Sequence, residues 1–430
     1  MSLKTKIGQQ LLLSMISPVI GLYYAFKSNN HRFIVFSGTL FMGLVGSAFM
    51  YTPGSDGHSH LEVVKAYYMD MSLIQFISDT GSLLILQPVE GSNDVYKHLL
   101  SYLAGGIFGI PELLHFFAAL VLGYFYTKSV LIVLEDKPKH KKPWLLLALI
   151  ALFLIIRSIS ALNSIRMWTG MWVFFYGSYA YVKRGNVKYL WVVFLATLIH
   201  FSYLLYAIPL VMAILLKRQK LLIAGLYVTS FFVTINFDIA SGLVQSTGLY
   251  EVKAKSNVIS KEELERRAAQ SAGNEQKANF YKELGPTVYA NYSIVFLSFV
   301  LLFFYLRKIT DIVHLEFLIA GGLIILALSN VSSSVSPSVS GRGSTIAATF
   351  LTAAAIQVLL LSDWLRLSGS VKKFINFSFA GFFISAIPYL LFHISYAINS
   401  VSVFIIAFPL SSWFLGDSDF SIRDAIGDII

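Results

Sequence analysis

The sequence is built mainly from apolar runs of about 20 residues, the length that an α-helix needs to cross the hydrocarbon core of a bilayer. A backbone in lipid has to satisfy its hydrogen bonds internally, so each run predicts a helix. Only 13% of the residues are charged, whereas soluble domains average about 25%. We therefore predict an all-α fold, a polytopic integral membrane helical bundle with about 10–13 transmembrane segments. The runs lie near residues 8–26, 33–51, 99–134, 144–162, 165–182, 189–216, 221–238, 289–306, 314–330, 344–361, 374–394 and 398–414.

Basic residues gather in short clusters between the apolar runs and outnumber acidic residues, with 33 Lys and Arg against 23 Asp and Glu. Clusters of this kind mark the cytoplasmic ends of transmembrane helices, so we expect a lipid bilayer and no nucleic acid as partner. The chain has no cysteine, which excludes a thiol nucleophile and thiolate metal sites. With the basic clusters in the cytoplasm, two polar loops at residues 52–98 and 239–288 face the outer side. We treat residues 1–430 as a single transmembrane domain.

Successive transmembrane helices place their connecting segments on alternate sides of the membrane, but this alternation fails at one point. Lys188 and Lys217 both have to be cytoplasmic, although one apolar run joins them. A hairpin of two half-length helices that turns around His200 resolves this conflict. Irregular backbone at membrane depth is tolerated only where it is buried in protein or lines a cavity, so the turn predicts a site.

Three arginines lie within or at the edge of apolar runs, near the outer ends of the predicted helices: Arg157, Arg166 and Arg342. An arginine at the centre of a span costs about 2.5–3.5 kcal/mol on insertion scales, so each needs a partner. Guanidinium groups pair bidentately with phosphate, and a helix N-terminus adds positive charge. The three either form one clamp for an anion, or each reaches lipid headgroups or pairs with a carboxylate. Their shared outer position favours the clamp.

Two residues are candidates for proton transfer. His200 is either a hydrogen-bonded packing residue or a group that binds substrate or moves a proton at the turn. Asp56 opens an acidic and histidine-rich stretch of the first outer loop. The spacing of His58 and His60 is weak evidence for a metal, so we expect no metal and favour contact with a sugar, or simple solvation.

Glu112 and His115 lie one helical turn apart after Pro111. Ionisable groups at membrane depth usually face a cavity, so we expect these two side chains to pair with each other inside the protein.

Two short motifs follow each other in the middle of the chain. Asn-x-x-Arg at residues 163–166 opens a predicted span, and Ala-x-x-x-His at residues 196–200 follows about 30 residues later. An acidic first outer loop with Asp56 and a later outer turn with Arg342 complete the pattern. This pattern resembles the EpsG-like branch of bacterial polysaccharide polymerases, and the order of spans over most of the chain is similar to that of the Wzy O-antigen and exopolysaccharide polymerases.

The resemblance implies a GT-C-like glycosyltransferase of the bacterial inner membrane that uses no soluble cofactor. Its substrates would be undecaprenyl-pyrophosphate-linked oligosaccharides, joined at the periplasmic or outer face. The product would be O-antigen, capsular polysaccharide or exopolysaccharide. A chain-length regulator and a flippase are the expected protein partners.

The resemblance also implies roles for the candidate residues. The donor pyrophosphate would be held by Arg157, Arg166 and Arg342, whose charge stabilises a departing diphosphate. The acceptor hydroxyl would be deprotonated by His200 or Asp56. The remaining candidates would support these groups: Asn163, Glu112 and His115.

Two other functions use the same features. A flippase or exporter of lipid-linked glycans also needs many spans and a basic cavity, although the sequence shows no inverted repeat. An O-antigen ligase would use the same chemistry with a different acceptor. Loss of a polymerase leaves a single repeat unit, loss of a ligase leaves polymer on the lipid carrier, and loss of a flippase leaves material that faces the cytoplasm.

Overall fold

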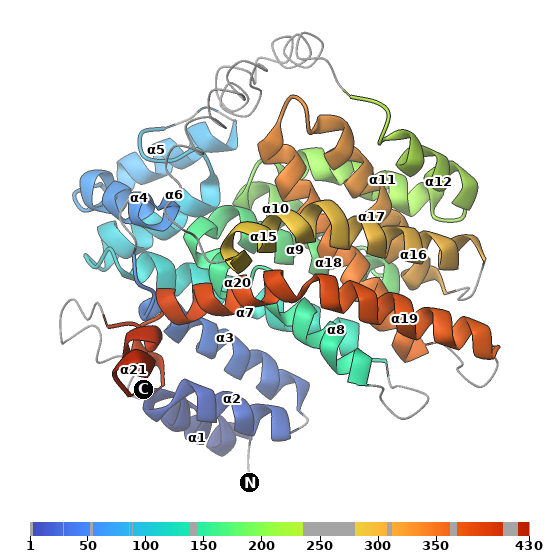
Figure 1. Cartoon of the computed structure of the whole chain (residues 1–430). Coiled ribbons are helices and arrows are strands. Elements are labelled where there is room, and N and C mark those ends of the chain that lie inside the picture. Colours follow the sequence, from blue (N-terminus) through green and yellow to red (C-terminus); the bar gives the residue numbers. More distant parts are fainter. Residues whose placement is uncertain are drawn as a thin grey trace.

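The structure, a computed structural model, is helical throughout the regular part of its described residues, apart from isolated β-bridges such as the one that joins Phe49 to Val401 (Figure 1). The predicted helical bundle is therefore confirmed at this level. The described residues are 3–28, 30–51, 55–85, 87, 89–136, 144–234, 280–307, 312–361, 368–406 and 420–429.

Short connections join most of these helices. The first half of the chain contains α1 (Leu3–Ile16), α2 (Pro18–Lys27), α3 (His31–Ser47), α4 (Asp56–Val63), α5 (Leu73–Leu84), α6 (Val95–Tyr102), α7 (Leu113–Leu134), α8 (Trp144–Ile155), α9 (Ile165–Arg184), α10 (Lys188–Ile199), α11 (Tyr203–Leu216) and α12 (Lys220–Thr229). The second half contains α15 (Phe280–Val288), α16 (Ile294–Leu306), α17 (Val313–Ser332), α18 (Pro337–Leu361), α19 (Gly369–Ser385), α20 (Ile387–Ser400) and α21 (Ile422–Ile429). A 3₁₀ turn, η3 (Ile159–Ser164), precedes α9, and π-helical turns are η1 (Val64–Tyr68), η2 (Leu103–Ile107) and η5 (Tyr289–Ser293).

Several helical stretches have the length and apolar composition of membrane spans. Five qualify within the described residues, and the bent pair of α19 and α20 makes a sixth. This supports a multi-pass membrane protein whose partner is a lipid bilayer. The larger number of about 10–13 segments stays a prediction, because it also requires shorter helices such as α10, α11 and α12 to lie in the bilayer.

The chain turns back on itself between α8 and α9. The ring of Phe153 in α8 lies 5.5 Å from that of Trp172 in α9, and Trp172 Nε1 donates to the carbonyl oxygen of Arg157 at 3.2 Å. A straight helix would place the two rings about 28 Å apart. Arg157, at the turn, has a φ of 47° in the left-handed region, which is uncommon for a residue with a side chain. The chain therefore folds back at this turn, which places Arg157 beside the start of α9.

Helices α3 and α7 approach closely because glycines lie at their contact. A Cβ atom at Gly46 would lie 2.4 Å from the carbonyl oxygen of His115, and one at Gly123 would lie 2.6 Å from Cβ of Met42. Small residues at such contacts let helix backbones meet without a hydrophobic driving force. The contact holds the first turn of α7, with the candidate residue His115, against α3.

The helix break predicted around residue 200 is present. Helix α10 ends at Ile199 and α11 begins at Tyr203. His200 is extended, with φ −151° and ψ 121°, and its Nδ1 accepts a hydrogen bond from the backbone N–H of Ser202 at 3.1 Å. The imidazole is thereby fixed at the break. That the two helices enter and leave one side of a bilayer stays a prediction.

The first predicted outer loop is folded. Its described residues contain α4, α5 and the start of α6, and these three helices lie together on one side of the molecule (Figure 1). The side chains of Ser55 and Ser72 cap α4 and α5 by accepting from backbone N–H groups in their first turns. Tyr68 Oη lies 2.8 Å from His98 Nδ1 in the interior of this segment. Caps and buried polar pairs of this kind turn a polar stretch into a compact layer.

The second predicted outer loop, residues 239–288, falls mostly outside the described residues. Its last part forms α15, which packs against α20. Directly after it, the ring of Tyr289 stacks on that of Tyr389 at 3.8 Å. This stack fixes α20 beside the turn that follows α15.

Candidate functional site

Arg166, in the first turn of α9, forms an ion pair with Asp94, which directly precedes α6. Its Nη1 lies 2.5 Å from Asp94 Oδ2, and the side chains are 27% and 5% exposed, respectively. A carboxylate buried to this extent needs a cationic partner to stay ionised. The pair joins α9 to the segment predicted as the first outer loop, and it is the carboxylate contact that was the alternative to the anion clamp.

Lys97 brings a second cation to the same place from the first turn of α6. Its Nζ donates to the carbonyl oxygen of Gly91 at 3.0 Å, and its side chain is buried. Burial, and after it the charge of Arg166, lowers the pKa of Lys97 to about 8, with partial opposition from Asp94. An amine that titrates near neutral pH can hold an anion or exchange a proton.

His60 of α4 lies among these charges. Burial, followed by the charges of Lys97, Arg166 and His115, lowers the pKa of His60 to about 2. The imidazole is therefore neutral at physiological pH. In the part of the chain that the structure describes, no three His, Asp or Glu side chains are close enough to hold a metal ion.

Asp56 and Asn163 meet where α4 begins and η3 ends. The backbone N–H of Gly57 donates to Asn163 Oδ1 at 3.1 Å, and Ser164 Oγ donates to Asp56 Oδ2 at 3.0 Å. These bonds dock the start of α4 onto the turn that leads into α9. The structure thus brings Asp56 and Asn163 together, directly before Arg166.

The break at His200 also reaches this region through Asp94. The backbone N–H of Phe201 donates to Asp94 Oδ1 at 3.4 Å, while Oδ2 accepts from Arg166. Asp94 therefore links three parts of the chain: the start of α6, the start of α9 and the break before α11. The half-buried ring of His200 lies 6.4 Å from that of Tyr203.

Arg342 lies near α11, the helix that follows this break. Its charge acts on the hydroxyl groups of Tyr203 and Tyr206 in α11. Tyr206 Oη donates to the carbonyl oxygen of Val339 at 3.0 Å, which ties α11 to the start of α18. The sequence predicted that Arg342 opens this helix, but α18 begins at Pro337, since proline is favoured in a first helical turn.

Arg157 lies among aromatic rings. Its guanidinium carbon is 4.1 Å from the centre of the Trp168 ring, and its charge acts on Tyr389 and Tyr396 of α20. Its Nε is buried and has no hydrogen-bond acceptor among the described residues. An orphaned buried donor of this kind is a place where an anionic or hydroxylated ligand gains affinity.

Glu112 and His115 both approach Tyr51 rather than each other. Tyr51 Oη lies 3.0 Å from His115 Nδ1, and the His115 ring stacks on Phe49 at 5.6 Å. Glu112 is close enough for its charge to act on Tyr51. The direct pair expected from their spacing is replaced by this aromatic cluster at the start of α7.

Sequence reasoning missed Asp94 and Lys97. The pair of Asp94 and Arg166 spans 72 residues, and no motif or helical spacing singles out Asp94 among the acidic residues of the first loop. The one usable signal was that Arg166 needed a carboxylate. The three arginines occupy separate contact sets: Arg166 with Asp94, Arg157 with Trp168, and Arg342 with Tyr203 and Tyr206.

No protein-family model, curated protein or solved structure matches this chain. The candidate site is therefore defined by geometry: Lys97 and Arg166 surround the buried carboxylate of Asp94. Phe201, the neighbour of His200, donates to Asp94, and Asp56 is bonded to Ser164, two residues before Arg166.

Proposed function

We propose that this chain is a membrane glycosyltransferase that polymerises undecaprenyl-pyrophosphate-linked oligosaccharide repeat units. The observation that carries the proposal is the cluster that Arg166 forms with the buried Lys97 and Asp94 beside the helix break at His200. Cations that are fixed before the reaction, in a site of low dielectric, stabilise an anion that develops during it. The anion that this reaction releases is undecaprenyl pyrophosphate.

In the proposed reaction, the acceptor hydroxyl attacks the anomeric carbon of the donor sugar, and the bond from that carbon to the pyrophosphate oxygen breaks. The proton passes to His200 or Asp56, and the electron pair leaves with undecaprenyl pyrophosphate. Lys97 and Arg166 stabilise the departing charge. Asp94 holds the two cations in place before the donor binds, which limits their reorganisation.

The other candidate residues surround this centre. Arg157, with its orphaned Nε above Trp168, offers a donor to a second pyrophosphate oxygen or to a sugar. Arg342 lies near Tyr203 and Tyr206 of α11, the helix that follows the break. In this proposal the three arginines still form one clamp, because they hold a single ligand from separate parts of the chain. The remaining candidates position α4 and α7: Asn163, Glu112 and His115.

The same proposal includes a GT-C-like arrangement in the bacterial inner membrane, with the site at the periplasmic or outer face. The clusters of basic residues between the apolar runs support this orientation. Such clusters mark the cytoplasmic ends of transmembrane helices, and the candidate site lies toward the other ends. The reaction requires no cofactor. A flippase would deliver the repeat units, and a chain-length regulator would act on the product.

Gel analysis of surface glycan from a strain that lacks this gene tests the proposal. Wild-type protein should restore a ladder of long chains, whereas Arg166→Ala should leave a single repeat unit at an equal level of protein. Arg307→Ala is the matched control and should restore the ladder, because Arg307 is exposed and lies over the ring of Phe303, outside the site.

The deletion strain separates this function from its alternatives. Polymer that accumulates on the lipid carrier would indicate a ligase, and repeat units that face the cytoplasm would indicate a flippase. A full-length ladder in the deletion strain would contradict the proposal outright.

A further inference from the structure

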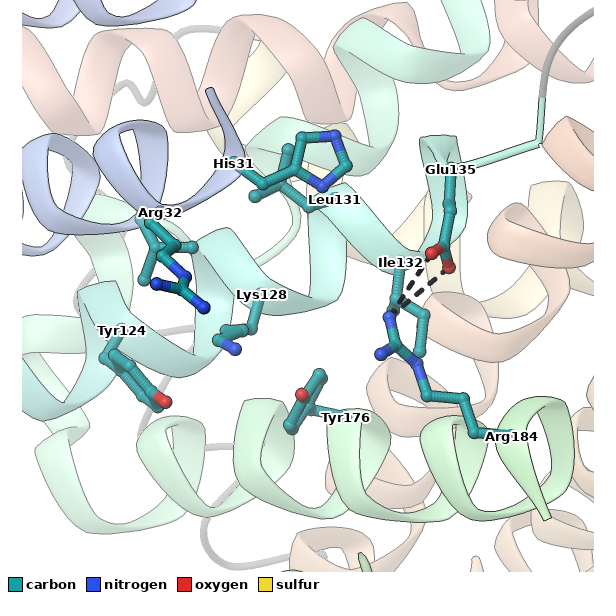
Figure 2. A pocket seen from close by; sticks show the side chains of 10 residues that line it. His31, Arg32, Tyr124, Lys128, Leu131, Ile132, Glu135, Tyr176 and Arg184 are labelled. Atoms are coloured by element: carbon teal, nitrogen blue, oxygen red, sulfur yellow. Dashed lines mark hydrogen bonds and ion pairs between the residues drawn. The ribbon is translucent and has the colours of Figure 1, made fainter. Parts of the chain in front are cut away.

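A second basic pocket lies between α3, α7 and α9, away from the candidate site. It is a cavity of about 280 Å³, and Figure 2 shows side chains from all three helices turned toward it. Its charged lining consists of Arg32, Lys128, Arg184 and Glu135, and Tyr124 and Tyr176 add two aromatic rings. The volume is slightly below the range of pockets for drug-sized ligands, about 300–1,000 Å³, and suits a small charged group.

Lys128 is the central cation of this pocket. It belongs to α7, one of the helices long and apolar enough to cross a membrane. Its Nζ lies 5.6 Å from the centre of the Tyr124 ring and 5.9 Å from that of Tyr176. No carboxylate of the described residues forms an ion pair with it. A lysine within a span without an acidic partner faces a cavity or a ligand.

The other charges of the pocket leave it positive. Arg184 Nη2 lies 3.4 Å from both carboxylate oxygens of Glu135 (Figure 2). This pair accounts for one cation and the one carboxylate of the lining. Arg32, at the start of α3, and Lys128 remain without an ion pair in the described part of the chain. Two uncompensated cations beside two tyrosine rings are chemistry that recognises a phosphate group.

The pocket and the candidate site lie at opposite ends of α9. Arg166 is in the first turn of this helix, whereas Tyr176 lies about 15 Å further along it and Arg184 is its last residue. Arg32 and Arg184, which line the pocket, belong to basic clusters between apolar runs. By the positive-inside rule, such clusters lie on the cytoplasmic side. A ligand bound here is therefore distinct from a donor pyrophosphate at Arg166.

We propose that this pocket binds the phosphate group of an anionic phospholipid headgroup from the cytoplasmic leaflet. Arg32 and Lys128 neutralise the phosphate, and Tyr124 and Tyr176 line its walls. Basic pockets between transmembrane helices on this side are suited to anionic headgroups. The inference does not depend on the glycosyltransferase proposal, because it concerns a separate set of residues and a separate ligand.

Native mass spectrometry of the purified full-length protein tests the proposal. Phosphatidylglycerol or cardiolipin should be retained at least about fivefold more than phosphatidylcholine, and Lys128→Met should lower that retention about fivefold. Arg32→Gln should have a similar effect; Arg32 is exposed, so this variant keeps the test valid if the change at the half-buried Lys128 impairs folding. Lys373→Met removes an exposed basic residue of α19, outside the pocket, and should retain lipid like the wild type.

Two further measurements distinguish a lipid headgroup from free inorganic phosphate as the ligand. Inorganic phosphate should not displace the bound lipid if the headgroup is the ligand. Saturable binding of inorganic phosphate that is lost in Lys128→Met, without preference for anionic lipid, would overturn the lipid assignment. Equal lipid retention by the wild type, Arg32→Gln and Lys373→Met would overturn the site altogether.

Discussion

The guanidinium group of Arg166 lies 2.5 Å from the carboxylate of Asp94, although 72 residues separate the two in sequence. This pair decides how the candidate site is held. It fixes the start of α9 against the start of α6, and through Asp94 it also reaches the helix break at His200. The cations are therefore in place before any substrate arrives, which is the condition for electrostatic stabilisation of a leaving group.

Asp94→Asn should destabilise the protein by about 3 kcal/mol, the low end for a broken buried ion pair, because Arg166 keeps some exposure. The variant leaves the Arg166 charge without its carboxylate. Asp94→Asn combined with Arg166→Met should be more stable than Asp94→Asn alone, since the second change removes the uncompensated charge. Thermal unfolding in detergent gives the ranking. Additive losses in the double variant would show that the two side chains are not coupled.

Stability should rise with pH in a range set by Lys97. Its pKa is about 8 in the folded protein, below the usual 10.5. Between these values the unfolded chain binds more protons than the folded one, so stability increases from about pH 8 to about pH 10.5 and is lost again as the pH falls through 8. Lys97→Met should abolish this increase in the unfolding temperature. Lys65→Met, at an exposed lysine paired with Glu62, should retain it. A wild-type slope in Lys97→Met would assign the effect to another group.

Substitution of a glycine by alanine should have opposite effects on stability at the contact of α3 with α7 and at an open position. Gly46→Ala places a Cβ 2.4 Å from the backbone oxygen of His115, which cannot move aside, and should destabilise by about 1–3 kcal/mol. Gly81→Ala in α5 meets nothing within 4 Å and should stabilise by about 0.5–1 kcal/mol through helix propensity. Unfolding temperatures of the two variants compare them directly. If both changed stability in the same direction, the close approach would not be the cause.

The outline of the fold was predictable from sequence because a bilayer imposes simple rules. Apolar runs gave the helical bundle, and the conflict between Lys188 and Lys217 located the break that the structure shows at His200. The packing of the first outer segment was not predictable. It depends on helix caps such as Ser55 and on buried polar pairs such as that of Tyr68 and His98, which leave no periodic signal.

The candidate site was predictable only in part, for a similar reason. An arginine at the edge of a span needs a partner, so its position in the sequence predicts one, and Arg166 has one in the structure. The identity of that partner depends on how the chain folds between distant residues, so Asp94 and Lys97 appear only in three dimensions. Asn163 and Asp56 were named separately, and the structure places them at one junction.

Arg157→Lys should lower the rate of glycan polymerisation about 100-fold, the usual loss when one donor to a developing anion is removed. Lysine keeps the charge but lacks the planar group that stacks on Trp168 and presents Nε. Chain length on gels, at matched protein levels, measures the effect. Arg307→Lys is the control and should polymerise normally. Wild-type chains from Arg157→Lys would remove Arg157 from the site.

The most direct test of the central claim uses the purified protein in lipid vesicles with an undecaprenyl-pyrophosphate-linked repeat unit as the only substrate. The proposed reaction predicts lipid-linked dimers and longer chains, with release of one undecaprenyl pyrophosphate for each bond formed, and it predicts neither product from Arg166→Ala. Intact repeat units that cross the bilayer without release of undecaprenyl pyrophosphate would contradict glycosyl transfer and identify a transporter.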